Sequence, residues 1–160
     1  MDYRQIPPLQ PGVAGSAVGM TCHPNMNTRL KETLDDLALL ADRQERIDYL
    51  ISIAEEFVNP GSDEVPRTAE NRVPGCESEA YIVAEPMGEG FKFRIAVDNP
   101  QGISAMAMAV ILDQSLSGEE VAAIREVPED IVYKIFGNEL SMGKSMGLTG
   151  MVRMVKAKAG

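Results

Sequence analysis

The sequence predicts an α+β fold in which helices pack on one face of a small antiparallel sheet. Helical periodicity runs up to residue 57, an alternating apolar–polar pattern follows between residues 79 and 97, and helical patterns return from residue 103 onward. A chain of 160 residues is long enough for one domain with a real core. We expect residues 28–160 to form that domain, preceded by a flexible tail over residues 1–27.

The tail contains four prolines and three glycines and shows no sustained period, a composition typical of an extended or disordered segment. Cys22 and His23 lie within it. A metal site would need further ligands, and the chain has one histidine and one other cysteine. A catalytic pair would require a flexible segment to hold His23 beside Cys76. We therefore interpret Cys22 and His23 as solvated tail residues.

Two amphipathic helices are predicted before residue 60. The apolar stripe of the first consists of Leu30, Leu34, Leu37 and Ala41. Asp42 is the expected N-cap of the second, with Glu45 at the capping-box position. The stripe of the second consists of Ile47, Leu50, Ile51, Ala54 and Phe57. The sequence Asn59-Pro60-Gly61 then ends it.

A polar connection over residues 60–75 leads to a predicted β-hairpin. Such a connection is long for a compact domain unless it is functional. Residues 79–85 are rich in β-formers, and a turn follows at residues 87–90. The next strand alternates Phe91, Phe93, Ile95 and Val97 with Lys92, Arg94, Ala96 and Asp98. This alternation predicts a half-buried antiparallel hairpin with one solvent-facing side.

Helices are predicted for the remainder of the chain. Residues 103–112 (ISAMAMAVIL) are apolar on nearly every side, so this helix should be the buried centre of the fold. Ser117 and Glu120 form a second potential capping box, and Pro128 and Gly137 mark the start and end of a further helix. The last helix should bury Leu148, Met151, Val152 and Val155, with Arg153, Lys156 and Lys158 near its C-terminus.

Charge and composition exclude several classes of function. The formal net charge is −9, whereas a nucleic-acid-binding protein needs a basic surface. No apolar run approaches the roughly 20 residues that span a membrane, and no basic segment followed by an apolar stretch begins the chain. Two widely separated cysteines do not form a disulfide framework. We therefore expect a cytoplasmic protein that binds neither nucleic acid nor membrane.

Residues 71–78 (NRVPGCES) carry the only cysteine in the patterned part of the chain. Pro74 fixes one backbone dihedral, and Gly75 permits conformations that other residues avoid. The pair therefore bends the chain and can hold Cys76 at the tip of a loop. A free cysteine usually behaves as a small buried hydrophobe. The polar neighbours of Cys76 instead predict an exposed, mobile position.

The segment NRVPGCESEAY, residues 71–81, resembles the active-site segment of the SufE family, which reads roughly N-x-V-x-G-C-Q-S-x-x-W. Glu77 stands where the family usually has Gln, and Tyr81 where it usually has Trp. The resemblance covers about residues 42–159 and includes the order of the elements. It implies the fold shared with iron–sulfur scaffold proteins. It also implies a sulfur acceptor for a pyridoxal-phosphate-dependent cysteine desulfurase, with Cys76 as the persulfide acceptor.

The implied chemistry needs few residues. Sulfur transfer is a thiolate attack on the outer sulfur of a persulfide, so one reachable cysteine is enough. A scaffold would need about three or four thiolate ligands, which this chain cannot supply. The resemblance therefore implies a sulfurtransferase-like carrier that binds no cofactor itself, activates the desulfurase and delivers sulfur to a scaffold. A cysteine hydrolase is disfavoured because no plausible base is present.

Charged residues around Cys76 act in opposite directions. Arg72 would favour the thiolate, whereas Glu77 and Glu79 would oppose it, and the sequence alone does not decide between them. We expect a thiol that is quiet in the free protein and becomes reactive when docking moves the loop outward.

Lys144 is the last candidate site residue. Residues 141–148 (SMGKSMGL) resemble the family segment P-S-R-S-x-G-L, whose Arg helps to engage the desulfurase. Lys144 keeps the charge but lacks the planar fork of Arg, and it lies near the start of the last helix, where it does not complement the dipole. An ordinary solvated lysine is the alternative. The alternative for the whole protein is a non-catalytic adaptor that regulates a desulfurase without carrying sulfur.

Overall fold

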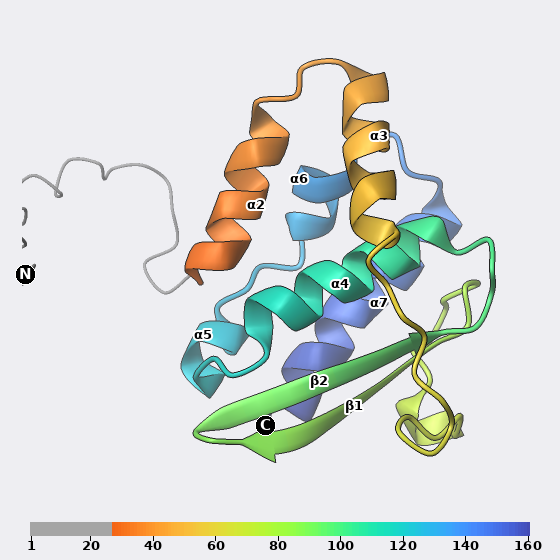
Figure 1. Cartoon of the computed structure of the whole chain (residues 1–160), viewed down its shortest axis with the longest axis vertical. Helices are drawn as coiled ribbons and strands as arrows, with labels where there is room; N and C mark the ends of the chain where they lie inside the picture. Colours follow the sequence, from red (N-terminus) through yellow and green to blue (C-terminus); the bar gives the residue numbers. More distant parts are fainter. Residues whose placement is uncertain (1–26) are drawn as a thin grey trace, which may run out of the picture.

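The structure is a computed structural model that describes residues 27–160. The predicted tail, with Cys22 and His23, lies outside these residues apart from Asn27. The described elements are α2 (Thr28–Ala38), α3 (Arg43–Ala54), the 3₁₀-helix η3 (Ala69–Asn71), β1 (Ala80–Met87), β2 (Gly90–Val97), α4 (Ile103–Leu116), α5 (Val121–Arg125), α6 (Ile131–Phe136) and α7 (Met142–Lys158). The helices lie on one side of a two-stranded antiparallel sheet (Figure 1), which confirms the predicted α+β fold.

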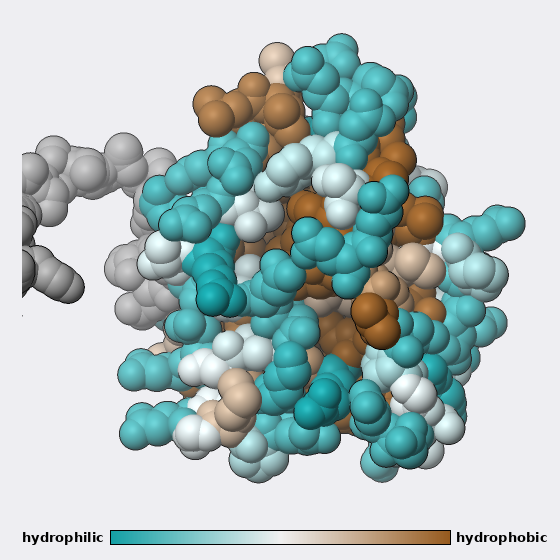
Figure 2. Space-filling model, viewed as in Figure 1, coloured by the Kyte–Doolittle hydropathy of each residue, from teal (hydrophilic) through white to brown (hydrophobic). Residues whose placement is uncertain are grey.

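The helices α2 and α3 run in opposite directions (Figure 1), and both pack on α4. Asp42 is the N-cap of α3, as predicted, and its carboxylate accepts hydrogen bonds from the backbone N–H groups of Gln44 and Glu45. The predicted buried stripe is wrong at Ile51, which is 40% exposed, because α3 turns Leu50 and Ala54 toward the core instead. Figure 2 shows apolar surface at the turn between α2 and α3.

The central helix is α4, as its apolar sequence predicts. It packs against α3, β2, α2 and α7. Its buried residues are Ala105, Ala107, Met108, Ala109, Val110, Ile111, Leu112, Ser115 and Leu116. A helix with neighbours on several sides needs apolar residues around most of its circumference.

The predicted hairpin is confirmed. The strands β1 and β2 pair in antiparallel register from Ala80 opposite Val97 to Met87 opposite Gly90. The expectation of a solvent-facing side is only partly right. Val65 from the preceding connection packs on that side with Tyr81 and Ala96, and all three are buried.

The predicted capping box of Ser117 and Glu120 is wrong. Ser117 follows the end of α4, where its hydroxyl donates to Asp113 Oδ1 at 2.6 Å and accepts from the backbone N–H of Phe93 at 2.9 Å. Ser117 therefore links α4 to β2 rather than capping α5. The helix α6 begins after Asp130 rather than at Pro128, and it ends at Gly137 as predicted.

The last helix, α7, runs beside β1 and contacts α4 and α6. Ser141 is its N-cap and accepts a hydrogen bond from the backbone N–H of Lys144 at 3.2 Å. The four apolar residues predicted to be buried are Leu148, Met151, Val152 and Val155, and all four are buried. Among the residues described, no helix is both long and apolar enough to cross a membrane.

Candidate functional site

Cys76 lies on a loop, residues 74–79, that precedes β1. The backbone N–H of Val73 donates to the carbonyl of Ala80 at 2.9 Å, and Arg72 pairs with Tyr81 in an antiparallel bridge. These contacts continue the pairing of β1 and close the loop at its root. Gly75 has a φ of 73°, as expected for the sharp bend.

The loop runs along α7 against three glycines, Gly143, Gly147 and Gly150, which we call the glycine face. A Cβ atom added to Gly150 would lie 3.0 Å from Val73 Cγ1. One added to Gly147 would lie 3.1 Å from Cys76 Cα, and one added to Gly143 would lie 3.0 Å from Glu77 Oε2. Successive loop residues therefore contact successively earlier turns of the helix. Any larger residue at these positions would meet the loop.

Asn71 fixes the start of this path. Its side chain is buried, donates to the carbonyl of Pro66 at 3.0 Å and accepts from Lys158 Nζ at 3.0 Å. The segment then follows α7 from its C-terminal end toward its N-terminal end, with turns at residues 74–75 and 77–78.

The prediction that Cys76 is exposed is wrong in this structure, whereas the mobility of its loop stays a prediction. Cys76 is 7% exposed and belongs to the main hydrophobic core, and its Sγ would lie 3.3 Å from a Cβ at Gly147. Along this segment Arg72, Pro74, Gly75 and Glu77 are exposed, whereas Val73 and Cys76 are buried. The polar neighbours of Cys76 therefore lie on the solvent-facing side of the segment, and the glycine face leaves room for the side chains on its buried side.

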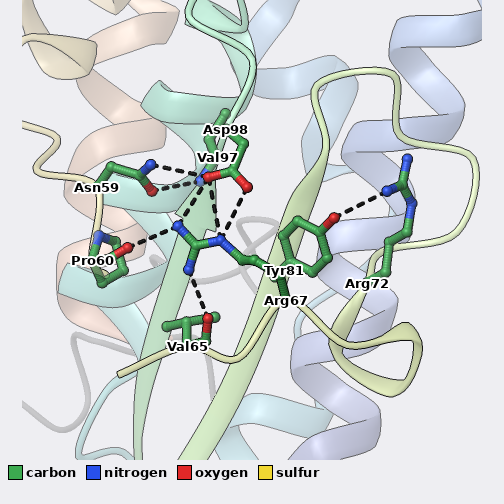
Figure 3. A network of polar contacts seen from close by, with 8 residues as sticks. All are labelled: Asn59, Pro60, Val65, Arg67, Arg72, Tyr81, Val97 and Asp98. Atoms are coloured by element: carbon green, nitrogen blue, oxygen red, sulfur yellow. Dashed lines mark hydrogen bonds and ion pairs between the residues drawn. The ribbon is translucent and has the colours of Figure 1, made fainter. Parts of the chain in front are cut away.

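Arg72 contacts Tyr81. Its Nη1 donates to Tyr81 Oη at 3.0 Å, and its guanidinium lies 5.7 Å from the ring centre (Figure 3). The hydroxyl of Tyr81 can accept this bond, whereas an indole N–H only donates. Tyr at this position, where the resembled motif has Trp, therefore has a specific partner in Arg72.

A second arginine, Arg67, joins the preceding connection to the end of β2 (Figure 3). Its guanidinium lies 5.7 Å from the centre of the Tyr81 ring and pairs with Asp98 at 2.9 Å. Hydrogen bonds from Arg67 hold the pKa of Asp98 below its ordinary value of 3.8, with a further contribution from Asn59. Because Val97 pairs with Ala80, this network fixes the root of the loop that carries Cys76.

Lys144 lies in the first turn of α7, next to Gly143. Its side chain is exposed and makes no ion pair or hydrogen bond with any residue of the described range 27–160. It borders a groove of about 830 Å³ whose lining includes Arg43, Ile51 and Ile103. The structure therefore brings Gly75, Cys76, Glu77 and Lys144 to the N-terminal half of α7, while Arg72 is directed to Tyr81.

Sequence reasoning missed the glycine face, Asn71 and two exposed methionines. Met142 and Met146 are 77% and 56% exposed, and they lie on the same two turns of α7 as Gly143 and Gly147. The signal for the glycine face was present in the sequence, since its members recur at helical spacing within a predicted helix. Within residues 27–160, no group of three or more His, Cys, Asp or Glu side chains is arranged to hold a metal ion.

Comparisons with known proteins agree with this picture. The model of the SufE family, described as an Fe-S metabolism associated domain, matches residues 31–159. An uncharacterized SufE-like protein of Rhizobium meliloti is 27% identical over 140 residues, which cover 82% of this chain and 95% of that protein. A second from Rhizobium etli is 28% identical over 134 residues, which cover 81% and 88%.

A solved structure shares the fold. The solution structure of a hypothetical protein from Thermus thermophilus superposes with a TM-score of 0.67 at 21% identity. The match covers 84% of this chain and 95% of that one. At this identity the likeness concerns the fold alone.

Proposed function

Because the chain belongs to the SufE family of Fe–S metabolism associated domains, we propose that Cys76 is a persulfide acceptor. The protein takes sulfur from a pyridoxal-phosphate-dependent cysteine desulfurase, stimulates that enzyme and passes the sulfur to an iron–sulfur scaffold in the cytoplasm. One observation carries the proposal: the single cysteine of residues 27–160 occupies the cysteine position of the family motif, on a loop beside exposed methionines.

The proposed transfer balances without an oxidant. The thiolate of Cys76 attacks the outer sulfur of the donor persulfide, and a new S–S bond forms as the donor S–S bond breaks. The donor leaves as a thiolate and takes up the proton that Cys76 has lost. Pyridoxal phosphate acts within the desulfurase, and this chain supplies the accepting sulfur atom.

The buried thiol requires a movement before transfer. Cys76 must leave the glycine face, while the bonds at the loop root, from Val73 to Ala80 and from Lys158 to Asn71, can persist. Gly75, already in the left-handed region, provides a hinge within the loop. Met142 and Met146 beside the glycine face offer adaptable apolar contacts to a docking partner. We propose Lys144 as a charged contact to the same partner.

Mass spectrometry after incubation with a desulfurase and cysteine tests the proposal. The parent protein should gain one sulfur atom that a reductant removes, and Cys76→Ser should gain none. The matched control is Cys22→Ser, which should gain sulfur as the parent does. Sulfur on Cys22 instead of Cys76 would contradict the assignment.

The burial of Cys76 also favours a second candidate, a non-catalytic adaptor that stimulates the desulfurase by docking alone. The two functions differ in one measurement. If Cys76→Ser accelerates desulfurase turnover as well as the parent does, and the parent gains no sulfur, the adaptor function is correct.

A further inference from the structure

We propose that Glu77 is a positioning residue, which holds the loop of residues 74–79 on α7 by placing its carboxylate at the N-terminal end of that helix. The inference rests on the proposed function, because the contact of Glu77 with α7 determines when the thiol of Cys76 is available for sulfur transfer. Its test uses the free protein without a desulfurase.

The contact is with the first turn of α7. A Cβ atom at Gly143 would lie 3.0 Å from Glu77 Oε2, 3.4 Å from Cδ and 3.7 Å from Oε1. Both carboxylate oxygens therefore lie close to the helix backbone, at a position that only glycine leaves open. One turn further along the same face, Gly147 contacts Cys76. Two consecutive loop residues thus occupy two consecutive turns, so the carboxylate and the thiol move together.

The charge of Glu77 suits this place. The first turn of a helix presents unpaired N–H groups and the positive end of the dipole. The sequence of α7 has no acidic residue in its first turn, and Lys144 adds a further positive charge there. Glu77 supplies from the loop the negative charge that α7 lacks. A Gln, as in the resembled motif, would fill the same space without this charge.

Glu79 is a matched control on the same loop. Its backbone N–H donates to the carbonyl of Cys76 at 3.3 Å, and its carbonyl accepts from the backbone N–H of Asp98 at 3.1 Å. The side chains of Glu77 and Glu79 are both exposed, and neither makes an ion pair or hydrogen bond with the rest of residues 27–160. They differ in that the Glu77 carboxylate approaches Gly143, whereas Glu79 approaches no residue of the glycine face. Replacing Glu77 or Glu79 by Gln removes one negative charge near the thiol, but only Glu77→Gln removes the charged contact with α7.

The first experiment measures the rate of alkylation of Cys76 by iodoacetamide against pH, in a Cys22→Ser background. The plateau at high pH reports how often the loop leaves α7, whereas the midpoint reports the charges around the thiol. We expect Glu77→Gln to raise the plateau roughly two- to fivefold, as for loss of a charge at a helix terminus. Glu79→Gln should move the midpoint and leave the plateau at the parent value. Equal plateaus in all three proteins would overturn the proposal.

The second experiment uses the other partner of the contact. In Gly143→Ala the added methyl group displaces the carboxylate, which is the far end of a flexible side chain. This substitution should raise the plateau in the parent and have no further effect in Glu77→Gln. An equal rise in both backgrounds would show that Gly143 acts independently of Glu77 and would overturn the proposal. The alkylation of the free protein is measured without a desulfurase, and the sulfur gain of the parent is measured without these variants, so the two proposals fail separately.

Discussion

The two ends of β1 are both turned by left-handed glycines, but they are held in different ways. At the hairpin end, Gly88 has a φ of 63°, and no atom lies within 4 Å of where its Cβ would be. At the other end, Gly75 has a φ of 73° and begins a loop whose inward residues contact α7. The bend at Gly88 has no distant neighbour, although Gly90 beside it lies against the backbone of Glu119, whereas the position of Cys76 depends on contacts along a helix that is distant in sequence.

This difference predicts that the stability of the hairpin and the accessibility of the Cys76 thiol can change independently. A loop held by contacts with another element can detach from that element while the strand pairing at the loop root persists. The equilibrium between the docked and the detached loop can therefore change without altering the hairpin. The following changes test whether the two ends of β1 are independent, and alkylation of Cys76 and the free energy of unfolding are the two measurements.

Gly147→Val should have the largest effect. A Cβ at Gly147 lies 3.1 Å from Cys76 Cα, and the further methyl groups of Val would fill the space that the loop occupies. Overpacking costs about 1–3 kcal/mol, which corresponds to a roughly 5- to 150-fold larger population of the open loop. The alkylation rate of Cys76 should rise accordingly. Thr149→Val, an isosteric change on the same helix, should leave the rate near that of the parent.

Asn71→Ala should have a smaller effect. The buried amide bonds both Pro66 and Lys158, and its loss leaves their polar groups without these partners. We expect a loss of about 1–2 kcal/mol in the free energy of unfolding and faster alkylation of Cys76. Lys158→Met removes one of the two bonds and should lose less. Unchanged alkylation in Asn71→Ala would mean that the start of the segment does not hold the loop.

Asp98→Asn should lower stability by about 1 kcal/mol at neutral pH, because the neutral amide loses the charge-assisted bond from Arg67. The pKa of Asp98 is lowered in the folded state below 3.8, so its contribution is complete only above about pH 5. This contribution disappears as the pH falls through the folded-state value. The difference between parent and variant, measured by urea unfolding, should therefore shrink in acid. Asp63→Asn, in the connection that carries Arg67, should show no such difference.

Glu85→Ala should have the smallest effect. Glu85 forms an exposed ion pair with Arg94 near the hairpin turn, at 3.2 Å. Such pairs contribute little, so we expect a change of less than about 0.5 kcal/mol in urea unfolding and no change in the alkylation of Cys76. Faster alkylation would show that the two ends of β1 are coupled and would contradict the comparison.

Features determined by neighbouring residues were predictable from the sequence. The alternation in β2, the Asp42 cap and the apolar α4 each depend on residues a few positions apart, and the structure confirms them. The motif at residues 71–81 also predicted the SufE family, and the match to the family model confirms this. The division into a tail over residues 1–27 and a domain over 28–160 stays a prediction.

Features determined by distant residues were not predictable from local patterns. Cys76 was expected to be exposed because its neighbours are polar, but Gly147 accommodates it from across the fold. Ser117 has the right spacing from Glu120 for a cap, yet its hydroxyl bonds Phe93 on β2. In both cases a tertiary contact overrides the local preference, and only the spacing of the glycines in α7 indicated such a contact.

The order of the elements along the chain has a consequence for synthesis. Cys76 is translated 82 residues before Lys158, because 158 − 76 = 82, and Lys158 is the last residue of α7. At roughly 5–20 residues per second, about 4–16 s pass between the two. During most of this interval the glycine face has not been made, so it cannot bury the thiol of Cys76. The new thiol is then unprotected by α7, as it is in the finished protein when the loop leaves that helix.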